Sequence, residues 1–147
     1  MNIALIMASL FQGAPHVPDS WVDAVGHVET GGESDPDNAV GDAGRAKGRY
    51  QFWQTAWADC SKIRAKYGQD VHPYSMATDP VISKEYARTW IAMCQRGVSL
   101  SIGRPATLAE TWCCYNRGLT GFRRLGFMLH RMPKYTQKNI SYLSKIK

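Results

Sequence analysis

The spacing of apolar residues constrains the fold of this chain most, because it follows the period of an α-helix in nearly every segment. In residues 19–29, Trp21, Val22, Val25 and Val28 recur at steps of three and four, which places them along one side of a helix. Alternating, strand-like patterns are weak throughout. The sequence therefore predicts a mainly α-helical protein, and its 147 residues suit one domain with one core.

Further helices are predicted at residues 55 to about 67, from Asp79-Pro80 onward and at residues 108 to about 115. Residues 122–147 are expected to form one or two amphipathic helices, broken at Pro133. Residues 97–105 are expected to be a connection. The expected caps are Asp19 or Ser20, Thr55, and Thr107 in a capping box with Glu110, while Gly118 and Gly121 end a helix. The aromatic residues expected in the core are Trp53, Trp57, Tyr74, Trp90 and Trp112.

One segment departs from the helical period. Residues 30–48 are rich in glycine and polar residues and contain few large apolar side chains. We interpret them as a long loop, with or without a small β-ribbon. Loops of this length in a compact domain are often functional.

Charge is distributed unevenly along the chain. Seven of the twelve acidic residues lie between Asp19 and Asp42, whereas no acid follows Glu110. The basic residues after Glu110 are Arg117, Arg123, Arg124, Arg131, Lys134, Lys138, Lys145 and Lys147. A basic surface of this kind favours a polyanion such as nucleic acid, anionic lipid or the bacterial cell wall, although a solvated helix face is an equally common explanation.

The N-terminus resembles part of a secretion signal. Residues 3–11 are apolar but too short to span a membrane, and Ala14 is a small residue near a plausible cleavage point. The usual positive start is missing, since no Lys or Arg precedes Arg45. We assign residues 1–18 to a candidate signal or an N-terminal extension packed on the domain, and residues 19–147 to the domain itself.

The four cysteines are Cys60, Cys94, Cys113 and Cys114, and none has zinc-site spacing. Four cysteines allow three connectivities, and a bond between the adjacent Cys113 and Cys114 would be strained. Export predicts one or two long-range disulfides, whereas an intracellular protein would keep buried thiols.

Glu29 is the strongest candidate for chemistry. It closes the apolar helix 19–29 and is followed by a glycine-rich loop in which a saccharide could lie. Desolvation at such a position raises a carboxyl pKa, and a carboxylic acid that stays protonated can donate its proton to a glycosidic oxygen. The alternative is an ordinary solvated glutamate near a helix C-terminus.

Other polar residues are candidates for binding. Gln51 has the donor and acceptor to bind a sugar amide, and Tyr50 is either a ligand contact or part of the core. Asp42 is either a second carboxylate or a turn residue. Tyr115 and Asn116 end a helix and offer an aromatic face with an amide, while Tyr135 lies in a basic segment expected to be helical.

In this order the motifs resemble the lysozyme-like superfamily, and most closely the soluble-type lytic transglycosylases and related bacterial or phage lysozyme-like domains. The resemblance covers about residues 20–145. The matching segments are Val28-Glu29-Thr30, Gly41-Asp42-Ala43-Gly44-Arg45-Ala46-Lys47-Gly48-Arg49-Tyr50-Gln51-Phe52 with Trp57, Tyr74 with Asp79-Pro80 and Ser83, Ala109 to Gly118, and Tyr135 with Lys138 and Tyr142. The departures are Thr30 where serine is usual, Cys113-Cys114 before the Tyr-Asn pair, and Arg117 where a small residue is usual.

The resemblance implies a mostly helical, two-lobed domain with a central cleft and no cofactor or metal. Glu29 would be the general acid and base, Gln51, Tyr115 and Asn116 would line the sugar site, and Tyr135 would sit near Glu29. The substrate would be the bond between N-acetylmuramic acid and N-acetylglucosamine in peptidoglycan, cut by a secreted, envelope or phage-associated monomer.

Two mechanisms fit this resemblance. A lytic transglycosylase uses Glu29 alone, whereas a hydrolytic muramidase would add Asp42 as a second carboxylate. We favour the transglycosylase because the order of motifs fits that family better. The hypotheses from other classes are a non-catalytic wall-binding module and a nucleic-acid binder that uses residues 117–147.

Overall fold

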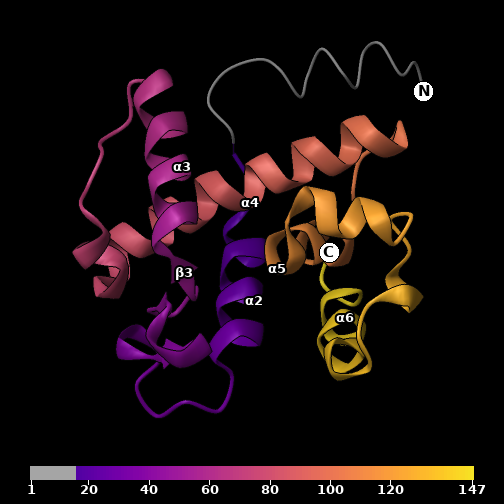
Figure 1. Cartoon of the computed structure of the whole chain (residues 1–147), viewed down its shortest axis with the longest axis horizontal. Helices are drawn as coiled ribbons and strands as arrows, with labels where there is room; N and C mark the ends of the chain where they lie inside the picture. Colours follow the sequence, from indigo (N-terminus) through magenta and orange to yellow (C-terminus); the bar gives the residue numbers. More distant parts are fainter. Residues whose placement is uncertain (1–15) are drawn as a thin grey trace. The chain divides into compact units, whose positions relative to one another are not determined.

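The structure is a computed structural model that describes residues 16–147, and in this part it is mainly helical with one small antiparallel sheet (Figure 1). The described residues fall into two compact units, Val17–Thr89 and Trp90–Lys147, the second together with His16. Residues 1–15 of the candidate signal segment lie outside the described residues.

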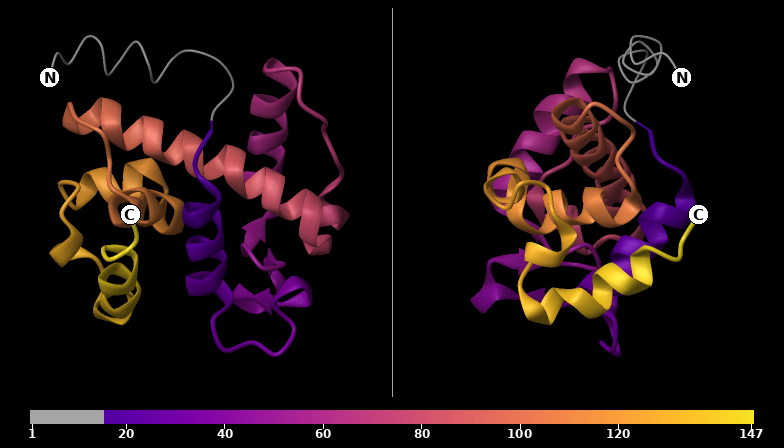
Figure 2. Two further views of the ribbon diagram at one scale, coloured as in Figure 1. Left: turned by 180° about the vertical axis from the view of Figure 1, so that it is seen from behind. Right: turned by 90° about the vertical axis from the view of Figure 1, so that its right-hand side faces the viewer.

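In the first unit, α2 (Asp19–Thr30) and α3 (Gln54–Lys66) both contact the first part of α4 (Pro80–Ile102), and Figure 2 shows all three from behind. The helix α2 buries Val22 and Val25, as the apolar spacing predicts. Its N-cap is Pro18, so the predicted cap at Asp19 or Ser20 is wrong. Asp19 pairs with Arg88 of α4 instead.

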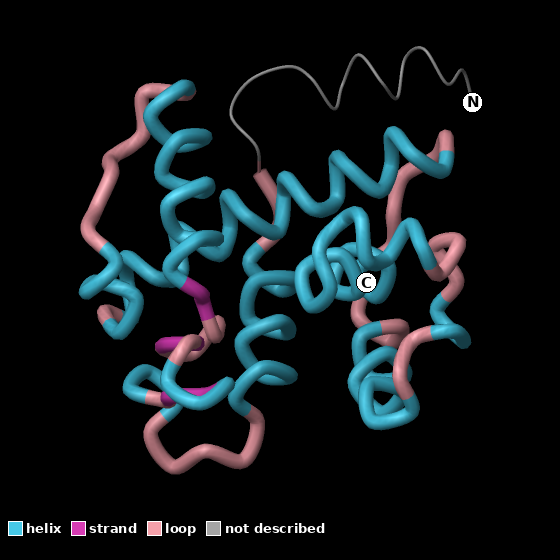
Figure 3. The backbone as a smooth tube through the Cα atoms, in the orientation of Figure 1, coloured by secondary structure: helices cyan, strands magenta, loops and turns pink. Residues whose placement is uncertain are grey.

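The glycine-rich loop contains a small β-ribbon, which is one of the two structures expected for it. Strands β1 (Val40–Gly41), β2 (Ala46–Lys47) and β3 (Phe52–Trp53) pair antiparallel in that order (Figure 3). Val40 pairs with Lys47, and Ala46 pairs with both Gly41 and Trp53. Two short 3-10 turns, η1 (Pro36–Asn38) and η2 (Asp42–Gly44), complete the loop.

Aromatic stacking forms the core between α3 and α4. The rings of Trp57 and Tyr86 stack with centroids 3.7 Å apart, and Phe52 meets Trp57 edge-on at 5.2 Å. The N-cap of α3 is Trp53, so Thr55 lies in the first turn and the predicted Thr55 cap is wrong.

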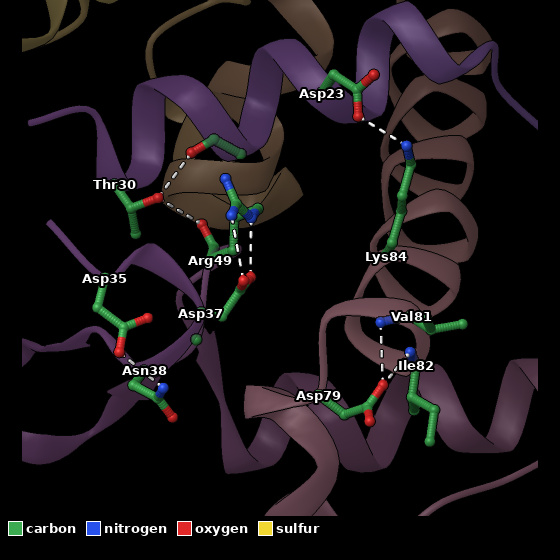
Figure 4. Close-up of polar contacts among 12 residues, drawn as sticks. Asp23, Thr30, Asp35, Asp37, Asn38, Arg49, Asp79, Val81, Ile82 and Lys84 are labelled. Atoms are coloured by element: carbon green, nitrogen blue, oxygen red, sulfur yellow. Dashed lines mark hydrogen bonds and ion pairs between the residues drawn. The ribbon is translucent and has the colours of Figure 1, made fainter. Parts of the chain in front are cut away.

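The start of α4 follows the sequence pattern. A short 3-10 segment, η3 (Tyr74–Thr78), precedes it, and the Asp79 Oδ1 atom accepts the backbone N–H groups of Val81 (3.0 Å) and Ile82 (2.9 Å), as Figure 4 shows. The predicted proline in the first turn is Pro80.

The second unit contains the rest of α4, α5 (Leu108–Arg124), two 3-10 turns, η4 (Leu129–Arg131) and η5 (Lys134–Thr136), and α6 (Gln137–Leu143), which packs on α5. The capping box is confirmed, since the Thr107 side chain accepts the Glu110 N–H at 3.2 Å and Glu110 accepts the Thr107 N–H at 2.9 Å. Gly118 interrupts α5 with φ 76°, as predicted, but helical geometry then resumes through Gly121 to Arg124, so the predicted stop at Gly121 is wrong.

A further prediction for this unit is wrong in its bounds, and another is confirmed in part. The connection expected at residues 97–105 begins only after Ile102, because α4 continues through Gly97, which lies against Leu119 of α5, and through the buried Val98. Of the one or two helices predicted for residues 122–147, one short α-helix, α6, forms after Pro133. The 3-10 turns η4 and η5 lie on either side of that proline.

The cysteines of the structure are all buried thiols, and no disulfide joins any two of them within residues 16–147. No helix in this part of the chain is long and apolar enough to cross a membrane. Among the described side chains there is also no group of three or more His, Cys, Asp or Glu residues that could hold a metal ion.

Candidate active site

Glu29 lies in the last turn of α2 and is half-buried. The next residue, Thr30, is buried, and its hydroxyl lies within hydrogen-bond distance of the Gly26 carbonyl (2.9 Å) and the Arg49 carbonyl (3.2 Å), as Figure 4 shows. The first bond closes the last turn of α2, and the second joins that turn to the ribbon. The hydroxyl that Thr30 shares with serine therefore fixes the helix end that carries Glu29.

An ion pair of Arg49 also stabilises this part of the loop. The Arg49 guanidinium binds the Asp37 carboxylate through two contacts, Nε to Oδ1 at 2.9 Å and Nη2 to Oδ2 at 3.2 Å (Figure 4). The hydrogen bond that Arg49 donates to Asp37 raises the pKa of Arg49, and this effect exceeds the opposing effect of burial. This ion pair thus joins the first and last parts of the loop between α2 and β3.

The side chain of Gln51 forms hydrogen bonds to the backbone around the ribbon. Its side-chain Nε2 donates to the Gly48 carbonyl at 2.9 Å and to the Ala39 carbonyl at 3.5 Å. Its amide oxygen occupies the space beside Gly41, where an added Cβ would lie only 2.1 Å away. Gly41 is therefore required by the position of Gln51, and the amide expected to contact sugar holds the turn between Ala39 and Gly48 in this structure.

Gly48 and Tyr50 also have structural reasons for their identity. Gly48 adopts φ 77°, and a Cβ there would lie 1.9 Å from the Ala77 carbonyl oxygen. Tyr50 is only 2% exposed and packs against Gly26 of α2, and burial raises the pKa of its hydroxyl to about 12. We therefore correct the predicted ligand contact of Tyr50: it belongs to the core, where it supports the ribbon against α2.

Asp42 orders the loop in which it lies. Its Oδ2 accepts the Trp53 indole N–H at 3.0 Å, and its backbone carbonyl accepts both the N–H and the Nε–H of Arg45. Asp42 itself is exposed and has φ 49°, a conformation that aspartate tolerates better than most residues. These contacts fit a turn residue, which is one of the two roles predicted for Asp42.

Trp53 is a candidate that the sequence analysis missed. It was expected in the core, but 40% of it is exposed, and the Arg45 guanidinium lies 4.8 Å from the centre of its ring. Side chains alternate across a strand, so the burial of Phe52 turns its neighbour Trp53 outward. A two-residue strand gives too little alternation to recognise this from sequence. Exposed aromatic faces are common contacts for sugar rings, so Trp53 joins the candidate binding residues.

The remaining predicted site residues belong to the second unit. Tyr115, half-buried, and Asn116, exposed, lie in α5 just before the break at Gly118. Tyr135 is 79% exposed and lies in the 3-10 turn η5, whereas a position in the final helix was expected; Tyr142 occupies α6 instead. The meeting of these residues with Glu29 at one sugar site stays a prediction.

Comparisons of this chain with protein-family models, with curated proteins and with solved structures found no match. The resemblance to lysozyme-like enzymes therefore stays a hypothesis, and its support comes from the residues of the site.

Proposed function

We propose that this protein is a peptidoglycan lytic transglycosylase with a lysozyme-like two-lobed fold and a central cleft, in which Glu29 is the general acid and base. One observation carries the proposal: Glu29 sits half-buried on a helix end that Thr30 binds to a ribbon built from the resembling motif. Gly41, Gly48 and Gln51 each have a specific steric or hydrogen-bonding role in that ribbon. These three residues of the resembling motif therefore serve one local geometry beside Glu29.

In the proposed reaction the Glu29 carboxyl donates its proton to the glycosidic oxygen, and the bond from that oxygen to C1 of N-acetylmuramic acid breaks. The Glu29 carboxylate then removes the proton from the C6 hydroxyl of the same sugar, and the C6 oxygen bonds to C1. The products are a chain ending in a 1,6-anhydro ring and a chain with a new free hydroxyl. Glu29 ends as it began, and no water is consumed.

Three of the four acids in the loop after Glu29 make structural contacts, which favours this single-carboxylate mechanism. Asp35 accepts from the Asn38 amide at 2.9 Å, Asp37 binds Arg49, and Asp42 accepts from Trp53. Each carboxylate thus has a structural contact within the loop. The second candidate, a hydrolytic muramidase, requires Asp42 to leave the Trp53 indole and serve the reaction instead.

Mass spectrometry of the products from purified peptidoglycan tests the proposal. We expect anhydro-muramyl ends, which are lighter by one water than the reducing ends that a muramidase would give. Reducing ends would refute the transglycosylase in favour of the muramidase. An absence of any product would refute both and favour a wall-binding module.

Three substitutions assign the roles. Glu29→Gln should abolish product formation, whereas Glu33→Gln is the matched control, because Glu33 is an exposed glutamate four residues further along. Asp42→Asn keeps an acceptor for Trp53 and should leave the anhydro products unchanged. Activity that survives in Glu29→Gln contradicts the proposed catalyst, and activity lost in Asp42→Asn favours the muramidase.

We further propose that the basic second unit retains the enzyme on the anionic cell wall, outside the cytoplasm. The eight basic residues from Arg117 to Lys147 are all exposed, and no ion pair joins any of them to an acid in the described part of the chain. Glu110, the one acidic residue after position 89, already pairs with Arg104 at 2.6 Å. Unpaired surface charge of one sign attracts a polyanion in a salt-dependent way.

Retention on purified cell walls in increasing salt measures this effect. Neutralising Arg123, Arg124 and Arg131 to glutamine should reduce retention, whereas Lys62→Gln with Lys66→Gln in the first unit should reduce it much less. Unchanged retention in the triple variant contradicts the proposal. Tight, strongly salt-dependent binding to arbitrary duplex DNA without wall retention would favour the nucleic-acid hypothesis.

A further inference from the structure

Two cationic side chains at the ribbon lie over aromatic rings of the first unit. The Arg45 guanidinium lies 4.8 Å from the centre of the Trp53 ring. The Lys47 ammonium group lies 5.1 Å from the centre of the Tyr74 ring. The Tyr74 hydroxyl donates to the Phe52 carbonyl at 2.6 Å and also lies 3.3 Å from the Arg45 carbonyl. Tyr74 therefore contacts both cationic residues, and the two pairs form one continuous cluster.

Asp42 fixes both members of the first pair. Its Oδ2 accepts the Trp53 indole N–H at 3.0 Å, and its backbone carbonyl accepts the Nε–H of Arg45 at 3.0 Å. The two terminal nitrogens of the Arg45 guanidinium take no part in these bonds, and Arg45 is exposed. A guanidinium held in this way presents a fixed pair of donors that matches the two oxygens of a carboxylate, and its immobilisation lowers the entropy cost of binding.

The charge of this cluster is not neutralised by the protein. Within residues 16–147 no ion pair joins Arg45 or Lys47 to an acid, whereas Arg49 in the same segment is bound to Asp37. The two positive charges exceed the single negative charge of Asp42 by one. A small positive excess beside an exposed aromatic ring suits a ligand with a few carboxylates and some apolar surface. It suits a densely charged phosphate chain less well, because Asp42 repels part of that charge.

We propose that this cluster binds a short acidic peptide. The terminal nitrogens of Arg45 donate to a carboxylate of the peptide, Lys47 attracts a second negative charge, and the exposed part of Trp53 contacts apolar side chains. The ribbon that carries these residues is bound to the helix end of Glu29, since the Thr30 hydroxyl lies 3.2 Å from the Arg49 carbonyl. We identify the peptide as the carboxylate-bearing stem attached to N-acetylmuramic acid; this identity rests on the proposed function, whereas the peptide site itself does not.

A nuclear magnetic resonance titration of the full chain tests the site without any need for catalysis. The probe is the free stem peptide that an amidase releases from purified peptidoglycan, and the signal is the indole N–H of Trp53, assigned with Trp53→Phe. We expect this signal to shift and saturate, with affinity about ten-fold weaker in Arg45→Gln and in Lys47→Gln. Lys66→Gln is the matched control and should bind like wild type, because Lys66 lies 5.9 Å from the Tyr67 ring at the far end of α3.

A second probe removes the charge from the ligand instead of the protein. The same peptide with its carboxyl groups converted to amides should bind wild type about ten-fold more weakly, and this comparison holds even if a variant fails to fold. No shift with the acidic peptide, or equal affinity for the two peptides, would overturn the inference. A single-stranded oligonucleotide that binds Trp53 more tightly than the peptide, with affinity falling steeply in salt, would replace the peptide by nucleic acid.

Cleavage assays link the site to the proposed reaction. Glycan strands that keep their stems should be cut with a lower KM than strands from which the amidase has removed them, and Arg45→Gln should remove this difference. Peptide binding without cleavage of either strand would support the site and contradict the proposed enzyme. Cleavage without peptide binding would overturn the site and leave the enzyme in place.

Discussion

Replacing Gly48 by alanine tests whether the ribbon motif is set by close packing or only by backbone flexibility. Two features of the structure require glycine at position 48. Its backbone is left-handed, with φ 77°, and it lies directly against η3, where a Cβ would be 1.9 Å from the Ala77 carbonyl oxygen. Gly44, in the same loop, shares only the left-handed backbone, since its φ is 88° and nothing lies within 4 Å of its added Cβ. Gly44→Ala is therefore the matched control.

The two substitutions should differ in cost. An L-residue in the left-handed region costs about 1 kcal/mol, and this applies to both positions. At Gly48 the methyl group must also displace a backbone carbonyl, and forced overpacking of this kind costs about 2 kcal/mol more. The displacement strains two hydrogen bonds of Gly48: its N–H donates to the Ala39 carbonyl (2.8 Å), and its carbonyl accepts from the Gln51 side-chain amide (2.9 Å). We expect Gly48→Ala to lose about 3 kcal/mol of unfolding free energy.

Urea unfolding and thermal melting, both followed by far-UV circular dichroism, measure the difference. Gly48→Ala should melt about 6 °C below Gly44→Ala, which itself should fall about 3 °C below wild type. Equal losses in the two variants would show that the contact with Ala77 does not constrain the loop. A Gly48→Ala protein as stable as wild type would refute the described packing of the ribbon on η3.

Substitutions at three other positions probe individual side-chain contacts. Thr30→Val should cost about 1–2 kcal/mol in urea unfolding because the Gly26 and Arg49 carbonyls lose their hydroxyl donor, while Thr30→Ser should cost less; equal losses would contradict the proposed tie. Glu110→Gln should cost about 1–2 kcal/mol at neutral pH. Burial raises the pKa of Glu110, but bonds from Arg104 and Thr107 outweigh it and leave the pKa lowered. This stability is therefore complete above the ordinary carboxyl pKa and is lost as pH falls through the lower folded value, so the gap between wild type and variant should close below about pH 4 in a series of melts; a gap independent of pH would refute the charge pairing. Thr111→Val should raise the unfolding free energy by about 1 kcal/mol, because the buried Thr111 hydroxyl has no hydrogen-bond partner within the described residues, and a loss of stability would reveal one.

Local sequence patterns predicted those elements that depend on neighbouring residues. The apolar period predicted α2 and its buried valines, Thr107 and Glu110 predicted the capping box, and Gly118 predicted the break in α5. A helix period and a cap require only residues within one or two turns, so the chain itself contains the whole signal.

Predictions failed where contacts distant in sequence decide the outcome. Gly97 suggested the end of a helix, yet α4 continues because Leu119 packs against that glycine. Trp53 resembled a core residue, yet Phe52 takes the buried position on the short strand β3. For Gly97 a partner far along the chain overrides the local preference. For Trp53 the override is indirect, because Phe52 is buried against Trp57 and Tyr86 and this turns Trp53 outward.

The candidate site shows the same division. Sequence placed Glu29 at the end of a helix beside a glycine-rich loop, and the structure agrees. The structure alone assigned Tyr50 to the core, Asp42 to the Trp53 indole and Gln51 to the ribbon backbone. Those assignments depend on which groups meet when the loop closes.

The order of residues by itself determined a helical protein with an acidic first part, a basic second part and one carboxyl at a helix end. Tertiary structure decided which loop acids are already bonded and which aromatic ring faces solvent. The physical reason is range: helix periodicity and net charge are properties of adjacent residues, whereas burial and hydrogen-bond partners exist only once distant segments pack together.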